Sequence, residues 1–169
     1  LVFDQGGKAN EITLFNLSFT SEMDILENET LTLTLPHFTN VAGWNTTRCE
    51  QDCSPSFTLF RSLSWQPEDD QLVVTLNRDV KAGEEVLASF GHDVGIALPY
   101  KGVRVNQATV TIGSNARDGP VLPTSILSTQ PVGSFTDSTA LSYSPGRAGK
   151  ISNVTISMRA EMAFSPGDT

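Results

Sequence analysis

The sequence has little of what catalytic, metal-binding or nucleic-acid-binding sites are usually built from. Its 169 residues include only two Cys and two His, and 11 Lys or Arg stand against 19 Asp or Glu, for a net charge of -8. This acidic balance disfavours binding to nucleic acid, which needs a basic surface, and docking on an anionic membrane. No apolar run approaches the roughly 20 residues that a membrane-spanning helix requires.

Catalytic motifs are also missing. Neither His37 nor His92 belongs to a recognisable triad, and the chain has no G-x-S-x-G elbow, H-E-x-x-H pair or phosphate loop. We therefore expect no enzyme activity and no cofactor. The acidic clusters at residues 68–70 and 84–85 offer oxygens to Ca²⁺, but without a spaced ligand pattern we interpret them as solvated turns.

What the chain does have is an internal repeat. Residues 7–30 and 146–169 align without a gap at a constant offset of 139 residues. The identical pairs are Gly7/Gly146, Ala9/Ala148, Ile12/Ile151, Ser18/Ser157, Glu22/Glu161, Met23/Met162 and Thr30/Thr169. A period of this size is that of a whole domain. We predict one repeat over residues 1–133, its first strand incomplete, and the opening strands of a second over residues 134–169, and we expect a piece of a longer tandem array.

The repeat predicts which side chains face a core. One parity of the aligned segment is apolar in both copies: Phe15, Leu17 and Phe19 match Val154, Ile156 and Met158. The other parity is mostly polar, with Ser18 matching Ser157. Strands bury alternate side chains, so this pattern indicates a half-buried strand of an antiparallel sheet.

Further segments have the pattern of strands separated by turns. They are residues 29–35, 57–65, 71–77, 85–90, 104–112 (with Val110 and Ile112 inward), 139–144 and, more weakly, 124–128. The segment 29–35 (ETLTLTL) alternates strictly and ends at Pro36, which has no N–H to donate. Short strands with turn chemistry between them predict an all-β fold, an antiparallel immunoglobulin-like β-sandwich in tandem repeat.

Four asparagines match the N-glycosylation pattern N-x-S/T: Asn16, Asn28, Asn45 and Asn153. Asn16 and Asn153 fall on the polar parity of equivalent strands, and Asn28 and Asn45 fall in predicted loops. Glycans at these positions would not disturb the core. We therefore predict a secreted or cell-surface glycoprotein that carries N-linked glycans.

The two cysteines, Cys49 and Cys53, lie in the polar stretch NTTRCEQDCSPS. A metal site would need more ligands than these two. A redox pair is an alternative, although no helix N-terminus is predicted that would lower a thiol pKa. We predict a local disulfide that closes a short loop and contributes little to global stability.

The tryptophans are the remaining candidates for binding. Trp44, in the loop VAGWNTT, and Trp65 each offer an aromatic face on which a sugar could stack. Trp65 alternates with Leu63 in a predicted strand and is expected in the core, which leaves Trp44 as the better exposed candidate.

Three stretches carry a resemblance to a known group of proteins: residues 32–39 (TLTLPHFT), the turn at 82–86 (AGEEV) and residues 121–158. The repeated elements are the turn at 144–149 (SPGRAG), the strand that starts at Ile151 and the turn at 165–169 (SPGDT). Together they resemble tandem repeats of large surface proteins of microalgae and other protists. The first copy departs from the pattern, with DQGG at residues 4–7 and LENE at residues 26–29. The resemblance implies an immunoglobulin-like, secreted and repeated domain.

Two functions follow as hypotheses. The first is a structural repeat of an extracellular filament, stalk or cell-surface coat, with neighbouring repeats and further copies of the protein as partners. The alternative is an adhesin or carbohydrate-binding module that uses end loops such as residues 40–56. The first is favoured because the repeat preserves core and turn residues while no convergent polar site is visible in the sequence.

Overall fold

The regular structure of the chain is built from antiparallel β-strands. The computed structural model describes residues 1–4, 7–43, 46–48, 59–133, 135, 138–160 and 164. A short 3₁₀ helix, η3 (His92–Val94), lies between β8 and β9. The strands are β1 (Val2–Phe3), β2 (Phe15–Thr20), β3 (Thr30–Thr34), β4 (Thr39–Asn40), β5 (Thr46–Arg48), β6 (Phe60–Gln66), β7 (Gln71–Leu76), β8 (Glu85–Phe90), β9 (Ile96–Ala97), β10 (Thr111–Ser114), β11 (Val121–Ser125), β12 (Ala140–Ser144) and β13 (Asn153–Ser157).

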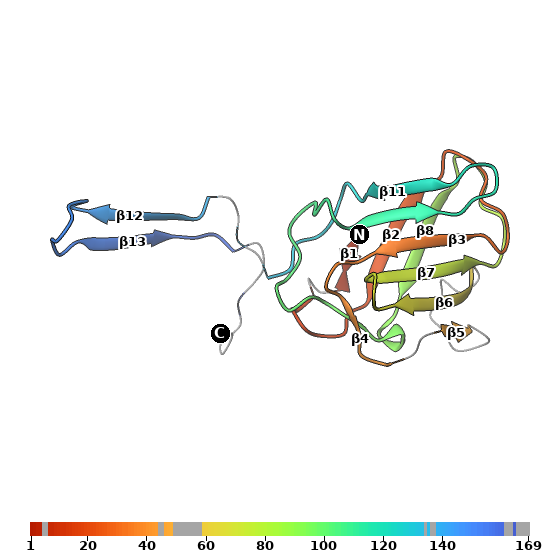
Figure 1. Ribbon diagram of the computed structural model, residues 1–169, viewed down its shortest axis with the longest axis horizontal. Coiled ribbons are helices and arrows are strands. Elements are labelled where there is room, and N and C mark those ends of the chain that lie inside the picture. Colours follow the sequence, from red (N-terminus) through yellow and green to blue (C-terminus); the bar gives the residue numbers. More distant parts are fainter. Residues whose placement is uncertain are drawn as a thin grey trace.

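Two main sheets and a short β4-β9 pair form the body of the protein, which we define as residues 1–133. The smaller sheet has the order β1-β2-β8, and the larger has the order β11-β10-β3-β7-β6-β5. Each pairing within them is antiparallel. Figure 1 shows them as two layers, with β2 and β8 crossing the strands of the larger sheet at a steep angle. This arrangement is consistent with the predicted β-sandwich.

The core lies between the two sheets. Alternate residues of β2, Phe15 and Leu17, are 1 % exposed, while Asn16 and Ser18 face solvent. Leu31 and Leu33 of β3 are buried from the opposite layer. All of these apolar side chains belong to one continuous cluster. The predicted inward parity is therefore confirmed for the first copy, with Phe19 partly buried against the same cluster.

Most of the predicted strands are present, and two predictions about their positions are wrong. Residues 104–110 are turns, and β10 begins at Thr111. The Gln107 side chain accepts a hydrogen bond from the N–H of Arg104 (3.1 Å), and the N–H of Val110 donates to the Gln107 carbonyl (3.0 Å). Such local bonds replace strand pairing in this segment. Val110 is nevertheless buried, as expected, and Ile112 is partly buried.

The second wrong position concerns β11, which covers Val121–Ser125 rather than residues 124–128. It includes Pro123, which cannot donate to a sheet ladder. Pro123 is accommodated because β11 is an edge strand, and the pairing of β10 with β11 shifts register between Ile112 and Ser114.

Beyond the body, β12 and β13 form a two-stranded hairpin that projects away from both sheets (Figure 1). All residues of both strands are exposed. Val154 and Ile156, predicted to face a core, are 57 % and 61 % exposed, because no other sheet of the described chain covers them. The predicted core row of the second copy is thus not buried in this structure.

Candidate functional site

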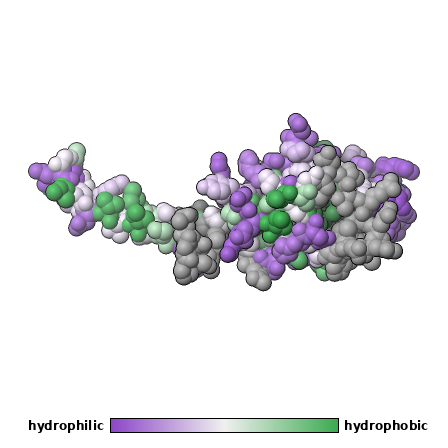
Figure 2. Space-filling model, turned by 90° about the horizontal axis from the view of Figure 1, so that it is seen from below, coloured by the Kyte–Doolittle hydropathy of each residue, from purple (hydrophilic) through white to green (hydrophobic). Residues whose placement is uncertain are grey.

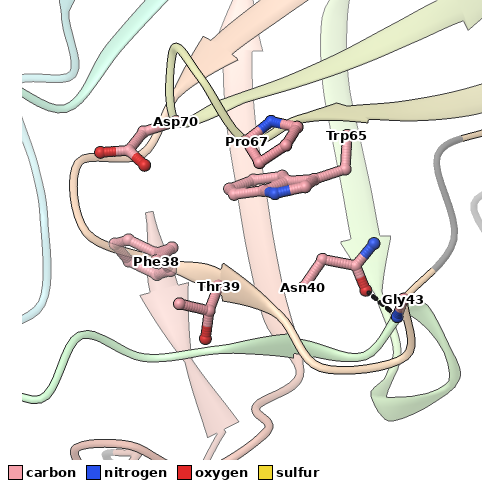
Figure 3. Close-up of a pocket in the computed structure, with 7 residues that line it drawn as sticks. All are labelled: Phe38, Thr39, Asn40, Gly43, Trp65, Pro67 and Asp70. Carbon is pink, nitrogen blue, oxygen red and sulfur yellow. Dashed lines mark hydrogen bonds between the residues drawn. The ribbon is translucent and has the colours of Figure 1, made fainter.

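A pocket of about 390 Å³ opens at the end of the body where β4 and the turn after β6 meet. Its lining combines two aromatic side chains, Phe38 and Trp65, with Thr39, Asn40, Gly43, Pro67 and Asp70. Figure 3 shows the ring of Pro67 lying over the indole of Trp65. Pockets with an apolar lining and a few polar groups are where small ligands bind most often.

The aromatic rings of this pocket are not presented as platforms. Trp65 is 6 % exposed and Phe38 is 2 % exposed, so both belong to the core, as predicted for Trp65. A sugar stacks on the open face of an aromatic ring, and little of either ring is open. Trp44, the other tryptophan singled out from the sequence, lies outside the described residues.

Two polar side chains of the pocket, Asn40 and Asp70, hold its own loops. The side-chain oxygen of Asn40 accepts a hydrogen bond from the N–H of Gly43 (3.2 Å, Figure 3). One carboxylate oxygen of Asp70 accepts from the N–H of His37 (2.8 Å). This bond holds His37 in the left-handed region, at φ 66°. The pocket has the shape of a binding site, but the side-chain oxygens of Asn40 and Asp70 are used to stabilise its loops.

Sequence reasoning did not single out Phe38, Thr39, Asn40, Pro67 or Asp70 as a group. They come from two turns about 30 residues apart that pairing in the larger sheet and the β4–β9 pair bring together. The sequence signals were the Pro-containing turn at 66–70 and the break in alternation after Pro36. Neither of these signals indicates that the two turns meet.

Both histidines are exposed, His37 in a turn and His92 at the start of η3. Among the described residues, no three His, Cys, Asp or Glu side chains gather as a metal site would require. Within the acidic clusters, Asp70 binds the backbone of His37, and Glu84 pairs with Arg78 at 2.7 Å. No helix in the described part of the chain is both long and apolar enough to cross a membrane.

A network of ion pairs joins the turn after β2 to the turn before β8. Lys81 donates to Asp24 (3.0 Å) and to Asp79 (3.4 Å). The pKa of Asp24 is lowered, first by the hydrogen bond from the N–H of Ala82 and then by Lys81. The pKa of Asp79 is lowered by the N–H of Glu27 and by Lys81, and the pKa of Lys81 is raised by these two carboxylates. The network braces two turns and is open to solvent.

Three of the four predicted glycosylation asparagines are described, and each is exposed. Asn16 lies on the outer face of β2, where its side-chain oxygen accepts from the hydroxyl of Ser89 (2.5 Å). Asn28 lies in a turn at φ 69° and accepts from the Arg61 guanidinium. Asn153 begins β13 on the polar face of the hairpin. Asn45, Cys49 and Cys53 lie outside the described residues, so their predicted modification and disulfide stay predictions.

A group of exposed apolar side chains lies on one face of the β12–β13 hairpin. Leu141 is directly opposite Ile156, and Tyr143 is directly opposite Val154. These four residues and Met158 are 54–61 % exposed. Figure 2 shows hydrophobic side chains grouped along the projecting hairpin. A contiguous apolar surface of this kind marks an interaction site more often than single exposed residues do.

Comparison of the chain with protein-family models, with curated proteins and with solved structures finds no match. The two candidate sites of the described chain are the hairpin surface and the Trp65 pocket.

Proposed function

We propose that this chain is a structural repeat domain of a secreted, glycosylated filament, stalk or cell-surface coat. The observation that carries the proposal is a correspondence between two hairpins, one formed by β1 and β2 and the other by β12 and β13. The sequence offset of 139 residues relates β2 to β13. Because the loop of the second hairpin is one residue shorter, the offset between β1 and β12 is 140.

Strand register supports the correspondence. In the first hairpin Val2 pairs with Asn16 and Phe3 pairs with Phe15. The two offsets carry these pairs to Ser142 with Thr155 and Tyr143 with Val154, and both pairs are present in the second hairpin. Register is specified by the side-chain pattern and by the turn, so a match in both strands argues for one shared supersecondary unit.

The connecting loops agree as well. The N–H of Glu11 donates to the carbonyl of Lys8 at 3.2 Å, and the N–H of Lys150 donates to the carbonyl of Arg147 at 3.3 Å. Both bonds span positions related by the offset of 139. Within these turns Asn10 (φ 64°) and Gly149 (φ 72°) occupy the same position and share the left-handed conformation. Turn, register and sequence therefore all support a repeated domain.

The surface supports an extracellular location. Asn16, Asn28 and Asn153 are accessible to glycosylation, and the net charge of -8 favours solubility of an exposed array. Resemblance to tandem repeats of protist surface proteins, with their immunoglobulin-like domains, points to the same location. Expression in a eukaryotic secretory host followed by peptide mass spectrometry checks this part, since unmodified asparagine at all three positions would argue against it.

Electron microscopy of the native protein tests the structural role. An antibody raised against residues 1–133 should label fibres, rods or a coat in negatively stained material, with labels at regular intervals. A second antibody against residues 138–160 provides the matched control, since repeats should place both labels on the same particles. Native material that consists of separate globular particles would contradict the proposal.

The second candidate function is a carbohydrate-binding module, and the Trp65 pocket is the observation that favours it. The pocket borders residues 40–43, at the start of the end loop that the sequence singled out. A glycan array probed with the chain tests this candidate, with Asn40→Ala as the pocket variant and Lys8→Ala, in the exposed loop between β1 and β2, as the control. Binding that is lost in Asn40→Ala alone would favour a lectin-like role, and an array without signal would remove it.

A further inference from the structure

The β12–β13 hairpin has two open surfaces that a β-sheet protein normally covers. One is its apolar face, with Leu141, Tyr143, Val154 and Ile156. The other is the outer edge of β13, because the two-stranded sheet β12-β13 has no further strand in the described chain. A lone two-stranded hairpin is marginally stable in water, so a third strand or a facing sheet is needed.

The body shows what covers the same two surfaces in the corresponding hairpin. The outer edge of β2 pairs with β8, where Phe15 lies opposite Phe90 and Leu17 opposite Ala88. The apolar face is buried in the core shared with the larger sheet. Leu1, Phe3, Phe15 and Leu17 are 1–6 % exposed. Their counterparts in the second hairpin, Leu141, Tyr143, Val154 and Ile156, are 54–61 % exposed.

The charges of the chain favour a second unit of this type as the partner that covers the hairpin. Residues 1–133 contain sixteen acidic and eight basic residues, whereas residues 138–160 contain three basic and no acidic residue. In the body Thr20 of β2 lies opposite Glu85 of β8. The offset of 139 places Arg159 at the position of Thr20. A strand with the charge pattern of β8 would therefore bring a carboxylate opposite an arginine in addition to the apolar pairing.

We propose that the β12–β13 hairpin is a strand donor that completes a β-sandwich unit of this same type lacking its own first hairpin. In the complex, β13 pairs antiparallel with a strand that has the chemistry of β8, and Val154 and Ile156 enter the core in place of Phe15 and Leu17. The inference rests on the proposed function, because it requires units of this type to recur. It goes further by naming what covers the open hairpin, which is the remaining strands of such a unit, added at the edge of β13.

A chimeric full chain tests whether the hairpin fits this place. Residues 1–20 are replaced by residues 141–159, and the matched control carries Val154→Asp and Ile156→Asp in the transferred segment. We expect the chimera to unfold cooperatively in urea, with amide exchange protection of β8 retained. Its Tm should be lower than that of the parent because valine cannot stack on Phe90. The control should not fold, and a chimera that is unfolded or behaves like its control would overturn the proposal.

A cross-link tests the register between two molecules. In a background with Cys49→Ser and Cys53→Ser, the donor is the full chain with Thr155→Cys. The acceptor lacks residues 1–20, carries Ser89→Cys on β8, and has its own hairpin disabled by Val154→Asp and Ile156→Asp. Asn16 lies opposite Ser89 in the body, so its counterpart Thr155 should reach the same position. Donor and acceptor are refolded together, and the yield of the disulfide between them is measured.

We expect this disulfide to form several-fold more efficiently than with an acceptor that carries Leu87→Cys, because Leu87 lies opposite Ser18 rather than Asn16. Equal yields, or no cross-link alongside a folded chimera, would overturn the proposal. The proposal would also be overturned if the unaltered chain formed dimers that Ile156→Asp abolished, because the hairpin would then bind a complete second copy. These tests use recombinant chains, so they can fail while native fibres are still seen, and they can succeed where native fibres are not.

Discussion

The ring of Phe15 on β2 stacks on the ring of Phe90 on β8, with centroids 4.6 Å apart and planes 19° from parallel. The two residues are directly opposite in the sheet, and Phe90 stacks in turn on Phe60 of the larger sheet at 5.7 Å. A row of three rings thus joins the first hairpin, β8 and the facing layer. This row packs the first hairpin against β8 and the facing layer, whereas its counterpart, with Val154 at the position of Phe15, has no facing sheet in the described chain.

The coupling between these two rings can be measured by a double-mutant cycle. Phe15→Leu, Phe90→Leu and the double variant should show an interaction free energy of about 0.5–1.5 kcal/mol, the range measured for stacked aromatic pairs. Urea denaturation of the four proteins gives the value. Additive losses would show that the stacking contributes nothing beyond burial of each ring.

Leu17 and Ile156 offer a direct comparison of equivalent positions. Leu17→Ala should lower the free energy of unfolding by about 2–5 kcal/mol, because a buried leucine leaves a cavity when truncated. Ile156→Ala should lower it by less than about 0.5 kcal/mol, because the side chain is 61 % exposed. Urea denaturation of both variants checks this. Similar losses for the two would mean that the hairpin is buried in solution.

Gly102 is predicted to resist substitution more strongly than other glycines at positive φ. A β-carbon at Gly102 (φ 73°) would lie 2.0 Å from the carbonyl oxygen of Val132, which accepts a hydrogen bond from Val103. At Gly83 (φ 79°) a β-carbon would meet nothing within 4 Å. Gly83→Ala should cost about 1 kcal/mol from backbone strain alone. Gly102→Ala should cost about 3 kcal/mol or more, because Val132 must also move.

Thermal melts of the two alanine variants make the comparison. If both lowered Tm equally, contact with Val132 would have no part in the requirement for glycine at position 102. The comparison also tests whether the core extends to Val132, which is the last residue along the chain that belongs to the described core.

Alternation of apolar and polar residues was sufficient to predict much of the fold. The strand over residues 85–90 was predicted with its observed bounds, and the inward leucines of residues 29–35 are buried. Alternation failed at residues 104–110, where Gln107 and its local hydrogen bonds favour turns over a strand. It also could not show that Pro123 lies within a strand, because that depends on β11 being at an edge.

The candidate sites were less accessible from the sequence. The pocket beside Trp65 depends on contacts between distant turns, which no local pattern encodes. Part of the open hairpin was predictable: the repeat identified Val154 and Ile156 as the apolar counterparts of Phe15 and Leu17. Their pairing with Tyr143 and Leu141 comes from the structure. Burial depends on a facing sheet, and that sheet is not part of the local sequence.

Stability should fall at acidic pH through the ion pairs that Lys81 and Arg78 make with carboxylates. The folded-state pKa values of Asp24, Asp79 and Glu84 are lowered from 3.8, 3.8 and 4.5. Groups with lowered pKa values stabilise the folded state above the pKa of the unfolded chain, and this contribution is lost as pH falls through the folded pKa. Tm should therefore decrease between about pH 5 and pH 2, where the carboxylates take up protons. The folded-state pKa of Lys81 is raised, so its contribution to stability is lost at alkaline pH, as the pH rises above 10.5.

Asp24→Asn separates this network from general acid effects. The amide retains an oxygen for the N–H of Ala82 (2.9 Å) but removes the charge that faces Lys81. The variant should have a lower Tm than the parent at pH 7 and a smaller decrease in Tm on acidification, so that the two melting curves approach each other at low pH. Glu68→Gln, on the exposed turn after β6, removes one negative charge elsewhere and should leave the difference between neutral and acidic pH unchanged. If Asp24→Asn and Glu68→Gln changed the pH dependence equally, net charge rather than the Lys81 network would be responsible.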